Sequence, residues 1–352
     1  MKQLISFASA ISFLLIAAMS CTDKSDLTPY VPQDCKLKLS VKDNPIVHYT
    51  DASVSGTITI SGDIEEFTSS IERASSVMVR WGTDKNQLDN STMASMNDAS
   101  INYGFMEIPF TAQLMGLEDG EVYYYQVVGK CGSLEPKQTD VLKFFTLPEG
   151  AIDLDLKSGN LWCSQNLGAT SPDEFGDYYA WGETQIKKTN AQYDWTNYKW
   201  CNGAYNKLTK YCSYSYQGYN GYTDDHKTLL DEDDAVVVNM GNGWHMPYPM
   251  DWTELSEQCG WTYVTINGIN GWLIRSKKNP DDNKKVIFIP FAGYYSGASK
   301  RRDDSGYYWT KAVSNDYYYQ DRAMYYFLSS YSYGLETGDR CCGETIRPVL
   351  SK

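Results

Sequence analysis

The 352-residue sequence predicts a multidomain chain with two folded parts of different class. Residues 35–147 predict an all-β antiparallel sandwich, and residues 151–352 predict an α+β domain. The prediction rests on a change of pattern, because apolar residues alternate with polar ones in the first part, whereas helical spacing and long irregular stretches occur only in the second. Between the two parts, the run Leu147-Pro148-Glu149-Gly150 combines a proline and a glycine, which end a strand and mark a boundary.

The first part shows a period of two in short runs. The alternating sets are Leu37 with Leu39 and Val41, Val54 with Ile58 and Ile60, Val77 with Val79 and Trp81, Phe105 with Ile108 and Phe110, Val122 with Tyr124 and Gln126, and Leu142 with Phe144 and Thr146. A period of two places alternate side chains on one face of a strand. About six or seven such strands over roughly 110 residues are typical of an antiparallel sandwich.

One run in this part resembles a known family. M-G-L-E-D-G-E-V-Y-Y-Y-Q-V, residues 115–127, resembles the L-x-P-x-T-x-Y-x-x-x-V signature of fibronectin type III domains, with Leu117 and Tyr123 on its Leu and Tyr. Asp119 replaces the Pro of that signature and Glu121 replaces its Thr. The resemblance implies that Tyr123 is a tyrosine corner, whose hydroxyl group hydrogen-bonds to the backbone a few residues upstream.

The second part is organised around residues 241–259, which read GNGWHMPYPMDWTELSEQC. Trp252, Leu255 and Cys259 stand at i, i+3 and i+7, which is the spacing of one helical face. Pro247 and Pro249 stop a strand from continuing into this helix. Further on, the pairs Asn267-Gly268 and Asn270-Gly271 predict a hairpin turn. Strands are expected at 272–276, 286–290, 306–310, 323–328 and 346–350.

Three motifs of this part resemble the Fibrobacter succinogenes major paralogous domain. G-W-H-M-P followed by Trp252 and Glu254-Leu255 resembles the signature G-W-R-M-P-T-x-x-E-W-x-E-L, and residues 159–169 and 175–184 resemble the family's earlier motifs G-x-x-W-x-x-x-N-L-x and G-x-Y-Y-x-W-G-E. The resemblance covers nearly all of 151–352 and implies a C-type-lectin-like or formylglycine-generating-enzyme-like fold.

The chain departs from this family at three positions. His245, Tyr248 and Asp251 replace the usual Arg, Thr and Glu. Without the Thr hydroxyl group one helix N–H lacks its side-chain partner, at a cost of about 1 kcal/mol. Asp251 and Glu254 have capping-box spacing, so we expect a cap one turn later.

The N-terminus predicts export and lipid attachment. Residues 1–20 combine Lys2 with an apolar run that is too short to span a membrane, which is typical of a signal peptide. Ala-Met-Ser before Cys21 resembles a bacterial lipoprotein cleavage box and predicts Cys21 as the lipid attachment site. An ordinary signal peptide with an incidental cysteine is the alternative. Residues 21–34 predict a tether. A charged run after Cys21 resembles the surface-export signal of Bacteroidetes lipoproteins, which implies an outer-membrane protein that faces the cell exterior.

The charge of the chain restricts its partners. The sequence carries a net charge of −13, and removal of residues 1–20 would leave −14 because that segment contains Lys2 and no acidic residue. Such a charge argues against nucleic acid as a partner and against electrostatic attraction to anionic lipid. Membrane attachment is therefore expected through the lipid on Cys21 alone.

Nine cysteines are present, and setting Cys21 aside leaves eight in a chain expected to be exported. Cys35 and Cys131 are expected at the same pole of the sandwich, where a disulfide is feasible and would contribute roughly 4–5 kcal/mol. Cys201 with Cys212 is a second candidate, by proximity in the sequence. A bridge from Cys163 to Cys341 is a third. Free buried thiols are the alternative for all of them.

The adjacent cysteines Cys341 and Cys342 raise an enzymatic alternative. The formylglycine-generating fold carries a redox cysteine pair just before its final strand, but that pair is separated, whereas these two residues are adjacent. We therefore assign no catalytic residue. Cofactors are not expected, although the acidic clusters Asp231–Asp234 and Asp303-Asp304 offer oxygen ligands for Ca²⁺. A solvated acidic helix start is the preferred interpretation of the first cluster.

The remaining signal is the aromatic content of residues 190–224, a region rich in Tyr, Asn, Gly and Trp that has little period and predicts long loops. Exposed aromatic rings stack on sugars and anchor protein interfaces. The predicted ligand-binding residues are Tyr193, Trp195, Tyr198, Trp200, Tyr216 and Tyr219. The sequence thus predicts a cell-surface lipoprotein that binds a glycan or protein ligand without catalysis. A formylglycine-type oxidase-like enzyme and a structural component of a surface complex are the alternatives.

Overall fold

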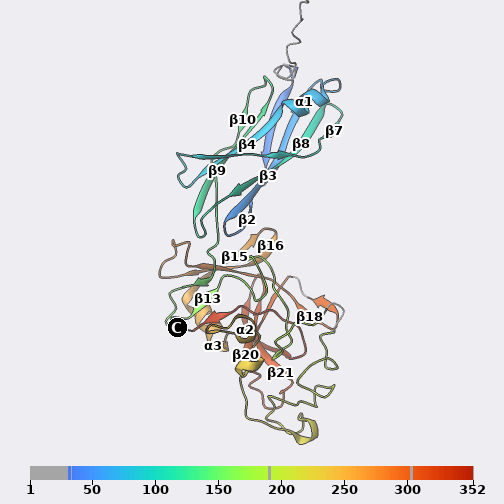
Figure 1. Ribbon diagram of the computed structural model, residues 1–352, viewed down its shortest axis with the longest axis vertical. Helices are drawn as coiled ribbons and strands as arrows, with labels where there is room; N and C mark the ends of the chain where they lie inside the picture. Colours follow the sequence, from blue (N-terminus) through green and yellow to red (C-terminus); the bar gives the residue numbers. More distant parts are fainter. Residues whose placement is uncertain (1–30, 33, 189–191, 302–303, 352) are drawn as a thin grey trace, which may run out of the picture.

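The computed structural model describes residues 31–32, 34–188, 192–301 and 304–351. The signal peptide, Cys21, most of the predicted tether and Asp303 lie outside the described residues. The described chain is rich in β-structure and contains several antiparallel sheets (Figure 1). No helix in this part of the chain combines the length and the apolar character that crossing a membrane requires.

Two antiparallel sheets make up the N-terminal part. The first follows the order β1-β3-β8-β6, with β2 paired to β3 and β7 paired to β8. Its strands are β1 (Lys36–Val41), β2 (Ile46–Val47), β3 (Asp51–Ser61), β6 (Ser95–Met96), β7 (Ser100–Asn102) and β8 (Phe105–Met115). The second sheet follows the order β10-β9-β4-β5, with β11 paired to β9. Its strands are β4 (Ser75–Gly82), β5 (Asn90–Met93), β9 (Val122–Cys131), β10 (Lys137–Gln138) and β11 (Leu142–Phe145), and α1 (Thr68–Ala74) precedes β4.

The two sheets enclose one hydrophobic cluster, as the alternation in the sequence predicts. Buried and less buried residues alternate along β3, β8 and β9, and the buried ones include Val54, Ile58 and Phe110. Val31 is also buried in this cluster, so the packed chain begins before the predicted boundary at Cys35.

The tyrosine-corner prediction is confirmed at the level of its hydrogen bond. The backbone N–H of Glu118 donates to the hydroxyl oxygen of Tyr123 at 2.8 Å. The ring of Tyr123 is buried and meets Trp81 edge-on, with ring centroids 5.8 Å apart. The hydroxyl group therefore ties the turn before β9 to the core face of that strand.

The C-terminal part consists of small antiparallel sheets and short helices. The sheets follow the orders β12-β13-β23-β14, β15-β16-β17, β18-β19 and β20-β21-β22. Their strands are β12 (Ala151–Ile152), β13 (Leu161–Cys163), β14 (Trp244–His245), β15 (Cys259–Ile266), β16 (Ile269–Ser276), β17 (Val286–Pro290), β18 (Tyr294–Ser296), β19 (Ser299–Arg301), β20 (Gly306–Val313), β21 (Arg322–Leu328), β22 (Tyr333–Asp339) and β23 (Val349–Leu350). The helices are η2 (Tyr219–Gly221), η3 (Asp231–Asp233), α2 (Ala235–Met240) and α3 (Pro249–Gln258).

The predicted helix of the central stretch is confirmed, and its cap differs from the expectation. α3 begins at Pro249 and buries Trp252 and Leu255, and the Trp252 ring stacks on Tyr326 at 4.5 Å. The cap does not form one turn later. Instead, the carboxylate of Asp251 accepts the N–H of Tyr248 at 2.7 Å and the side-chain amide of Asn160 at 2.9 Å. Asp251 therefore fixes the first turn of the helix and joins it to the loop before β13.

The predicted boundary residues are packed against the C-terminal part. Leu147 is buried in a cluster with Tyr49, Leu273 and Phe288. Gly150 exchanges two hydrogen bonds with Ser164, one from its own N–H to the serine hydroxyl at 3.0 Å and one from the serine N–H at 2.8 Å. The tail of the N-terminal part is thus joined to the sheet that contains β13.

Candidate functional site

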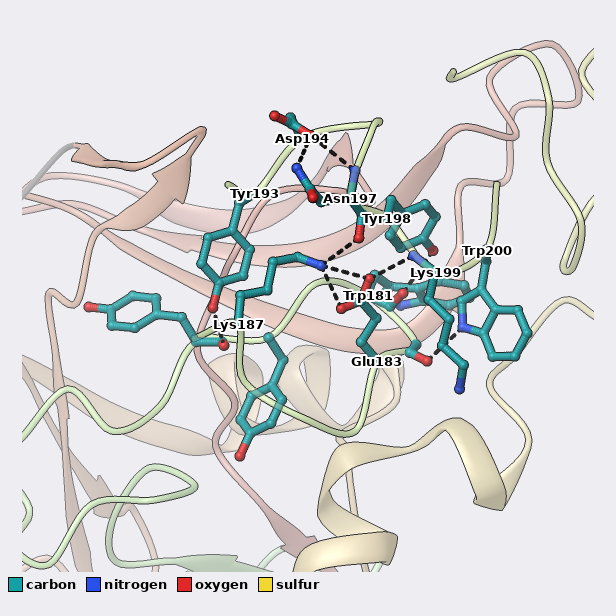
Figure 2. Close-up of polar contacts among 12 residues, drawn as sticks. Trp181, Glu183, Lys187, Tyr193, Asp194, Asn197, Tyr198, Lys199 and Trp200 are labelled. Carbon is teal, nitrogen blue, oxygen red and sulfur yellow. Dashed lines mark hydrogen bonds and ion pairs between the residues drawn. The ribbon is translucent and has the colours of Figure 1, made fainter. Parts of the chain in front are cut away.

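Two of the six predicted ligand-binding residues are core residues. Tyr193 and Tyr198 are buried in one cluster with Ala180 and Cys341. The Tyr193 hydroxyl donates to the carbonyl of Tyr178 at 2.7 Å, and the Tyr198 hydroxyl donates to that of Trp181 at 2.8 Å (Figure 2). The prediction that these two rings bind ligand is wrong, because both rings are buried and their hydroxyl groups bind the backbone of residues 178 and 181, which precede the loop.

The two tryptophans are half-buried and also have structural contacts. The indole N–H of Trp200 donates to the carbonyl of Gly182 at 2.7 Å. The ammonium groups of Lys199 and Lys210 lie over the Trp200 ring, 4.1 and 4.8 Å from its centroid. Trp195 meets Tyr198 edge-on at 5.5 Å. Two lysine ammonium groups therefore already contact the Trp200 ring.

A buried ion pair fixes the start of this loop. The Glu183 carboxylate accepts the Lys187 ammonium group at 2.8 Å and the backbone N–H of Lys199 at 2.8 Å. Lys187 also donates to the carbonyl of Asn197 at 2.9 Å, as Figure 2 shows. Glu183 belongs to the W-G-E motif singled out in the sequence, and its role here is to hold the loop.

The exposed aromatic rings gather elsewhere, on two loops that are distant in the sequence. Tyr216 is 81% exposed, and Tyr317 and Tyr318 are 51% and 65% exposed. All three surround the half-buried Tyr214, with ring centroids 5.3, 4.8 and 5.5 Å from it. We call Tyr214, Tyr216, Tyr317 and Tyr318 the tyrosine surface. Of the predicted residues, Tyr216 belongs to it, and Tyr219 lies on the same loop and is 40% exposed.

Side-chain amides join the two loops of the tyrosine surface. Gln217 accepts the backbone N–H of Gln320 at 2.7 Å and donates to Asp321 at 3.0 Å. The side-chain amide oxygen of Gln320 accepts a hydrogen bond from the Ser213 hydroxyl group at 2.9 Å. Both glutamines are buried, so these bonds are shielded from water. The two loops that carry the rings are therefore joined to one another by shielded hydrogen bonds.

Two charged residues, Asp224 and Arg340, bind the backbone just before Tyr214 in the first loop of the tyrosine surface. The Asp224 carboxylate accepts the backbone N–H groups of Tyr211 and Cys212 at 2.6 and 3.0 Å. Arg340 is fully buried and donates to the carbonyls of Tyr211 and Lys210 at 2.7 and 3.3 Å. Tyr211 has φ = 58°, a left-handed conformation that is uncommon outside glycine. The charged contacts on both sides of this residue stabilise the turn that leads to Tyr214.

Tyr317 and Tyr318 are not among the ligand-binding residues that the sequence predicts. They belong to a run of three consecutive tyrosines after Asn315-Asp316. Three adjacent aromatic residues in a polar context cannot all face one core, so at least one ring of such a run is expected at the surface. The run of tyrosines therefore predicts an exposed ring. It does not predict that these rings contact the loop at Tyr214.

The acidic cluster Asp231–Asp234 pairs with lysines. Asp234 is fully buried, accepts the N–H of Val236 as the N-cap of α2, and lies 3.3 Å from the Lys311 ammonium group. Asp233 is also buried and accepts Lys210 and the Tyr211 hydroxyl. The interpretation as a solvated helix start is therefore wrong for these two residues. Burial alone would lower the pKa of Lys311, but Asp234 and Asp231 outweigh it and raise that pKa. In the described residues, no group of three or more His, Cys, Asp and Glu side chains could hold a metal ion.

The predicted disulfides are absent among the described residues, where all eight cysteines are free thiols. The thiol of Cys201 donates to the carbonyl of Trp195 at 3.0 Å, and that of Cys212 donates to Tyr214 at 3.2 Å, so these two groups have separate partners. Cys35 and Cys131 are buried in the cluster between the first two sheets without a bridge. Cys163 and Cys341 belong to different contacts, since Cys163 lies near Arg347 and Cys341 packs with Tyr193.

Comparison with known proteins leaves the chain without an assigned family. No family model matches it, and no curated protein matches it. Among solved structures, a cycloalternan-forming enzyme from Listeria monocytogenes is similar at 12% identity and a TM-score of 0.26, over 94% of this chain and 31% of the enzyme. The sensor domain of an anti-sigma factor from Pseudobacteroides cellulosolvens is similar at 13% identity and a TM-score of 0.19, over 33% of this chain and 95% of that domain. Likenesses at these scores carry no argument about function.

Proposed function

We propose that the protein is a non-catalytic binding protein that engages a glycan or protein ligand through the tyrosine surface. The observation that carries this proposal is the gathering of exposed rings from two distant loops around Tyr214. A tyrosine ring offers a large apolar face and a polar tip at low entropic cost, which suits both sugars and protein partners.

A glycan is the first choice of ligand. The rings meet at angles from 47° to 87°, so they present several ring faces and edges and form no single flat apolar patch. A pyranose ring offers apolar C–H faces and a rim of hydroxyl groups, which a broken surface of this kind matches. Asp316 is exposed beside the rings, and its free acceptor capacity can receive sugar hydroxyl groups.

The polar groups beneath the rings support a binding role over a catalytic one. The amide oxygens of Gln217 and Gln320 join the two loops, and the Asp224 carboxylate binds the backbone of the first loop. A general acid or base must reach the reacting group of a substrate. These groups are instead committed to the fold, which is the arrangement expected of a preformed binding surface.

We also propose the domain and anchoring scheme that the sequence predicts. A fibronectin type III-like sandwich over 35–147 would carry a C-type-lectin-like domain over 151–352 of the Fibrobacter succinogenes major paralogous type. Lipid on Cys21 would hold both at the outer membrane, facing the cell exterior. In Figure 1 the loop region drawn in yellow-green and yellow lies at the end of the molecule away from α1 and β10. Such an arrangement would present the tyrosine surface away from the membrane.

The test is a pair of alanine variants measured against glycans. Tyr216→Ala and Tyr317→Ala should each reduce affinity for a glycan identified on an array by roughly thirtyfold, about 2 kcal/mol, because each removes an anchoring ring. Tyr103→Ala is the matched control, since Tyr103 is 95% exposed in the N-terminal part. Isothermal titration calorimetry measures the affinities, and melting temperatures should stay equal.

The outcomes separate the alternatives. A blank array together with capture of a defined partner protein by wild type, and not by Tyr216→Ala, would assign a protein ligand to the same surface. Equal binding by wild type, Tyr216→Ala and Tyr317→Ala would move the site away from the tyrosine surface.

A further inference from the structure

The adjacent thiols Cys341 and Cys342 occupy a turn that is fixed on both sides. The turn closes through the N–H of Cys342, which donates to the carbonyl of Asp339 at 3.0 Å. Before it, Arg340 is fully buried. After it, Gly343 exchanges two backbone hydrogen bonds with Tyr295, at 2.7 and 2.9 Å. A Cβ atom at Gly343 would lie 2.6 Å from the Tyr193 ring, so the residue after the pair is packed closely against that ring.

The two thiols follow one another in this turn and differ in access to solvent. The neighbouring Cys342 side chain, and then burial, raise the pKa of Cys341. Cys341 is 4% exposed, whereas Cys342 is only partly buried. A partly exposed thiol next to a buried one is the arrangement of an attacking and a resolving cysteine.

A buried carboxyl group without a partner lies beside the pair. Glu344 is 2% exposed, and its Oε2 atom has no hydrogen-bond partner among the described residues. Burial, and then the nearby Cys342, hold the pKa of Glu344 well above its usual range. Burial therefore favours the neutral form of this carboxyl group over the ionised form. An unpartnered buried polar group in a folded protein calls for a functional explanation.

The other thiols are arranged differently. Cys201, Cys212 and Cys131 donate to backbone carbonyls at 3.0 to 3.9 Å, as structural cysteines do. Among the described residues, Cys341 and Cys342 are the one pair that is adjacent in the sequence.

We propose that Cys341 and Cys342 are a reversible thiol–disulfide site, which closes to a disulfide between adjacent residues when it meets a small disulfide or a thiol–disulfide oxidoreductase. The Cys342 thiolate attacks one sulfur of the incoming disulfide, forms a mixed disulfide and releases the first thiol. Cys341 then loses its proton, attacks the Cys342 sulfur and releases the second thiol. The protein loses two hydrogen atoms, and the co-reactant disulfide becomes two thiols.

Adjacency makes this bond a labile one. Adjacent Cα atoms are about 3.8 Å apart, below the usual range of about 4.4–6.8 Å for a disulfide. A disulfide outside that range stores strain and is reduced more readily, which is typical of regulatory bonds and not of structural ones. The site is also placed to affect the loops, since Arg340 before it holds the carbonyl of Tyr211.

The experiment is a mass measurement on the full chain. The protein is reduced, freed of reductant, exposed to oxidised glutathione, alkylated with iodoacetamide and digested with trypsin. Trypsin cleaves after Arg340 and spares the Arg347–Pro348 bond, so both thiols fall on the single peptide 341–352. In wild type this peptide should carry no alkyl group and should weigh less by two hydrogen atoms, and dithiothreitol should reverse the change.

Two variants and one probe sharpen the test. In Cys342→Ser the loss of two hydrogen atoms should disappear, whereas Cys201→Ser, which changes another partly exposed thiol, should keep it. Phenylarsine oxide, which bridges two close thiols, should protect the wild-type peptide from alkylation and should not protect Cys342→Ser. The proposal is overturned if the wild-type peptide is alkylated at both cysteines after oxidation. It is overturned as well if the peptide is found joined to another cysteine. The mass change of the wild-type peptide decides between these outcomes by itself, so the test still works if a variant fails to fold.

Discussion

The side-chain amide of Asn267 pairs with the backbone of Val47 as another strand would. The N–H of Val47 donates to the amide oxygen at 2.8 Å, and the amide nitrogen donates to the Val47 carbonyl at 2.8 Å. Asn267 stands in the predicted turn between β15 and β16, and Figure 1 shows this hairpin next to β2. One residue of the C-terminal part thus completes the hydrogen bonding of a short strand in the N-terminal part.

This pairing predicts a specific loosening of the junction. Asn267→Gly removes the amide and keeps a residue that tolerates φ = 51°, so the turn should remain intact. Three partly buried hydrogen bonds are lost, the two to Val47 and one to Asp173 at 3.1 Å, and this should reduce the free energy of unfolding by about 1–3 kcal/mol. It should also speed proteolysis between the exposed residues Glu149 and Gly150.

Asn270→Gly, in the exposed part of the same hairpin, is the control for that variant. Unchanged stability together with unchanged cleavage in Asn267→Gly would show that the amide pair does not hold the junction.

The buried Arg340 predicts a residue-specific anchor for the tyrosine surface. Arg340→Lys keeps the charge but cannot reach the carbonyls of both Lys210 and Tyr211 with the planar fork of a guanidinium group. We expect a loss of about 2–4 kcal/mol in stability because a buried acceptor loses its donor. Hydrogen exchange of residues 210–217 should rise. Arg322→Lys, at a half-exposed arginine that lies 3.9 Å from Asp339, should leave this exchange unchanged.

The hydrogen bonds of the Asp155 carboxylate predict that part of the free energy of unfolding depends on pH. Its carboxylate accepts Lys285 at 2.7 Å, Ser276 at 2.6 Å and Asn279 at 2.8 Å. These bonds, that from Lys285 foremost, lower the pKa of Asp155. A lowered pKa means that the unfolded chain takes up this proton at a higher pH than the folded chain. The stabilisation of the folded state by the Asp155 carboxylate is therefore complete above about pH 5 and is lost as the pH falls through 4 and below.

Asp155→Asn is the matched variant, because asparagine tolerates φ = 58° as aspartate does. Its stability should lie about 2 kcal/mol below wild type at neutral pH, since hydrogen bonds to a charged group are lost. Urea unfolding across the acid range should show the gap closing as the pH falls. The exposed Asp98→Asn serves as the control, and a gap that stays constant with pH would contradict the assigned role of the charge.

Cys21 predicts how the protein is held at the membrane. Cys21→Ser should release the exported protein from the membrane fraction, because the expected attachment is through acyl chains on that sulfur. Fractionation after a salt wash, followed by immunoblotting, measures the release. Retention of the variant in the membrane fraction would contradict the lipoprotein assignment.

Local patterns in the sequence determined the regular elements. The alternation along β3, the i, i+3 spacing of Trp252 and Leu255 in α3 and the Asn267-Gly268 turn each depend on neighbouring residues, and all three are present in the structure. Cys259, the predicted i+7 member of the helical face, begins β15 instead. The bond between Tyr123 and Glu118 is equally local, since five residues separate its partners. Such features follow from backbone geometry and solvent alone, so the sequence by itself predicts them.

Only the tertiary structure decided which aromatic residues are exposed. Tyr193 and Tyr216 stand in the same irregular region with similar neighbours in the sequence, yet one is 7% exposed and the other 81%. The difference comes from distant partners, because Tyr193 packs on Tyr295 whereas Tyr216 meets Tyr214 at the surface. In a loop without a hydrophobic period, a side chain is buried only where a distant part of the chain packs against it. Tyr214 and Tyr317 are in contact although more than 100 residues separate them in the sequence. The free energy that decides such contacts is that of long-range packing, which no local pattern records.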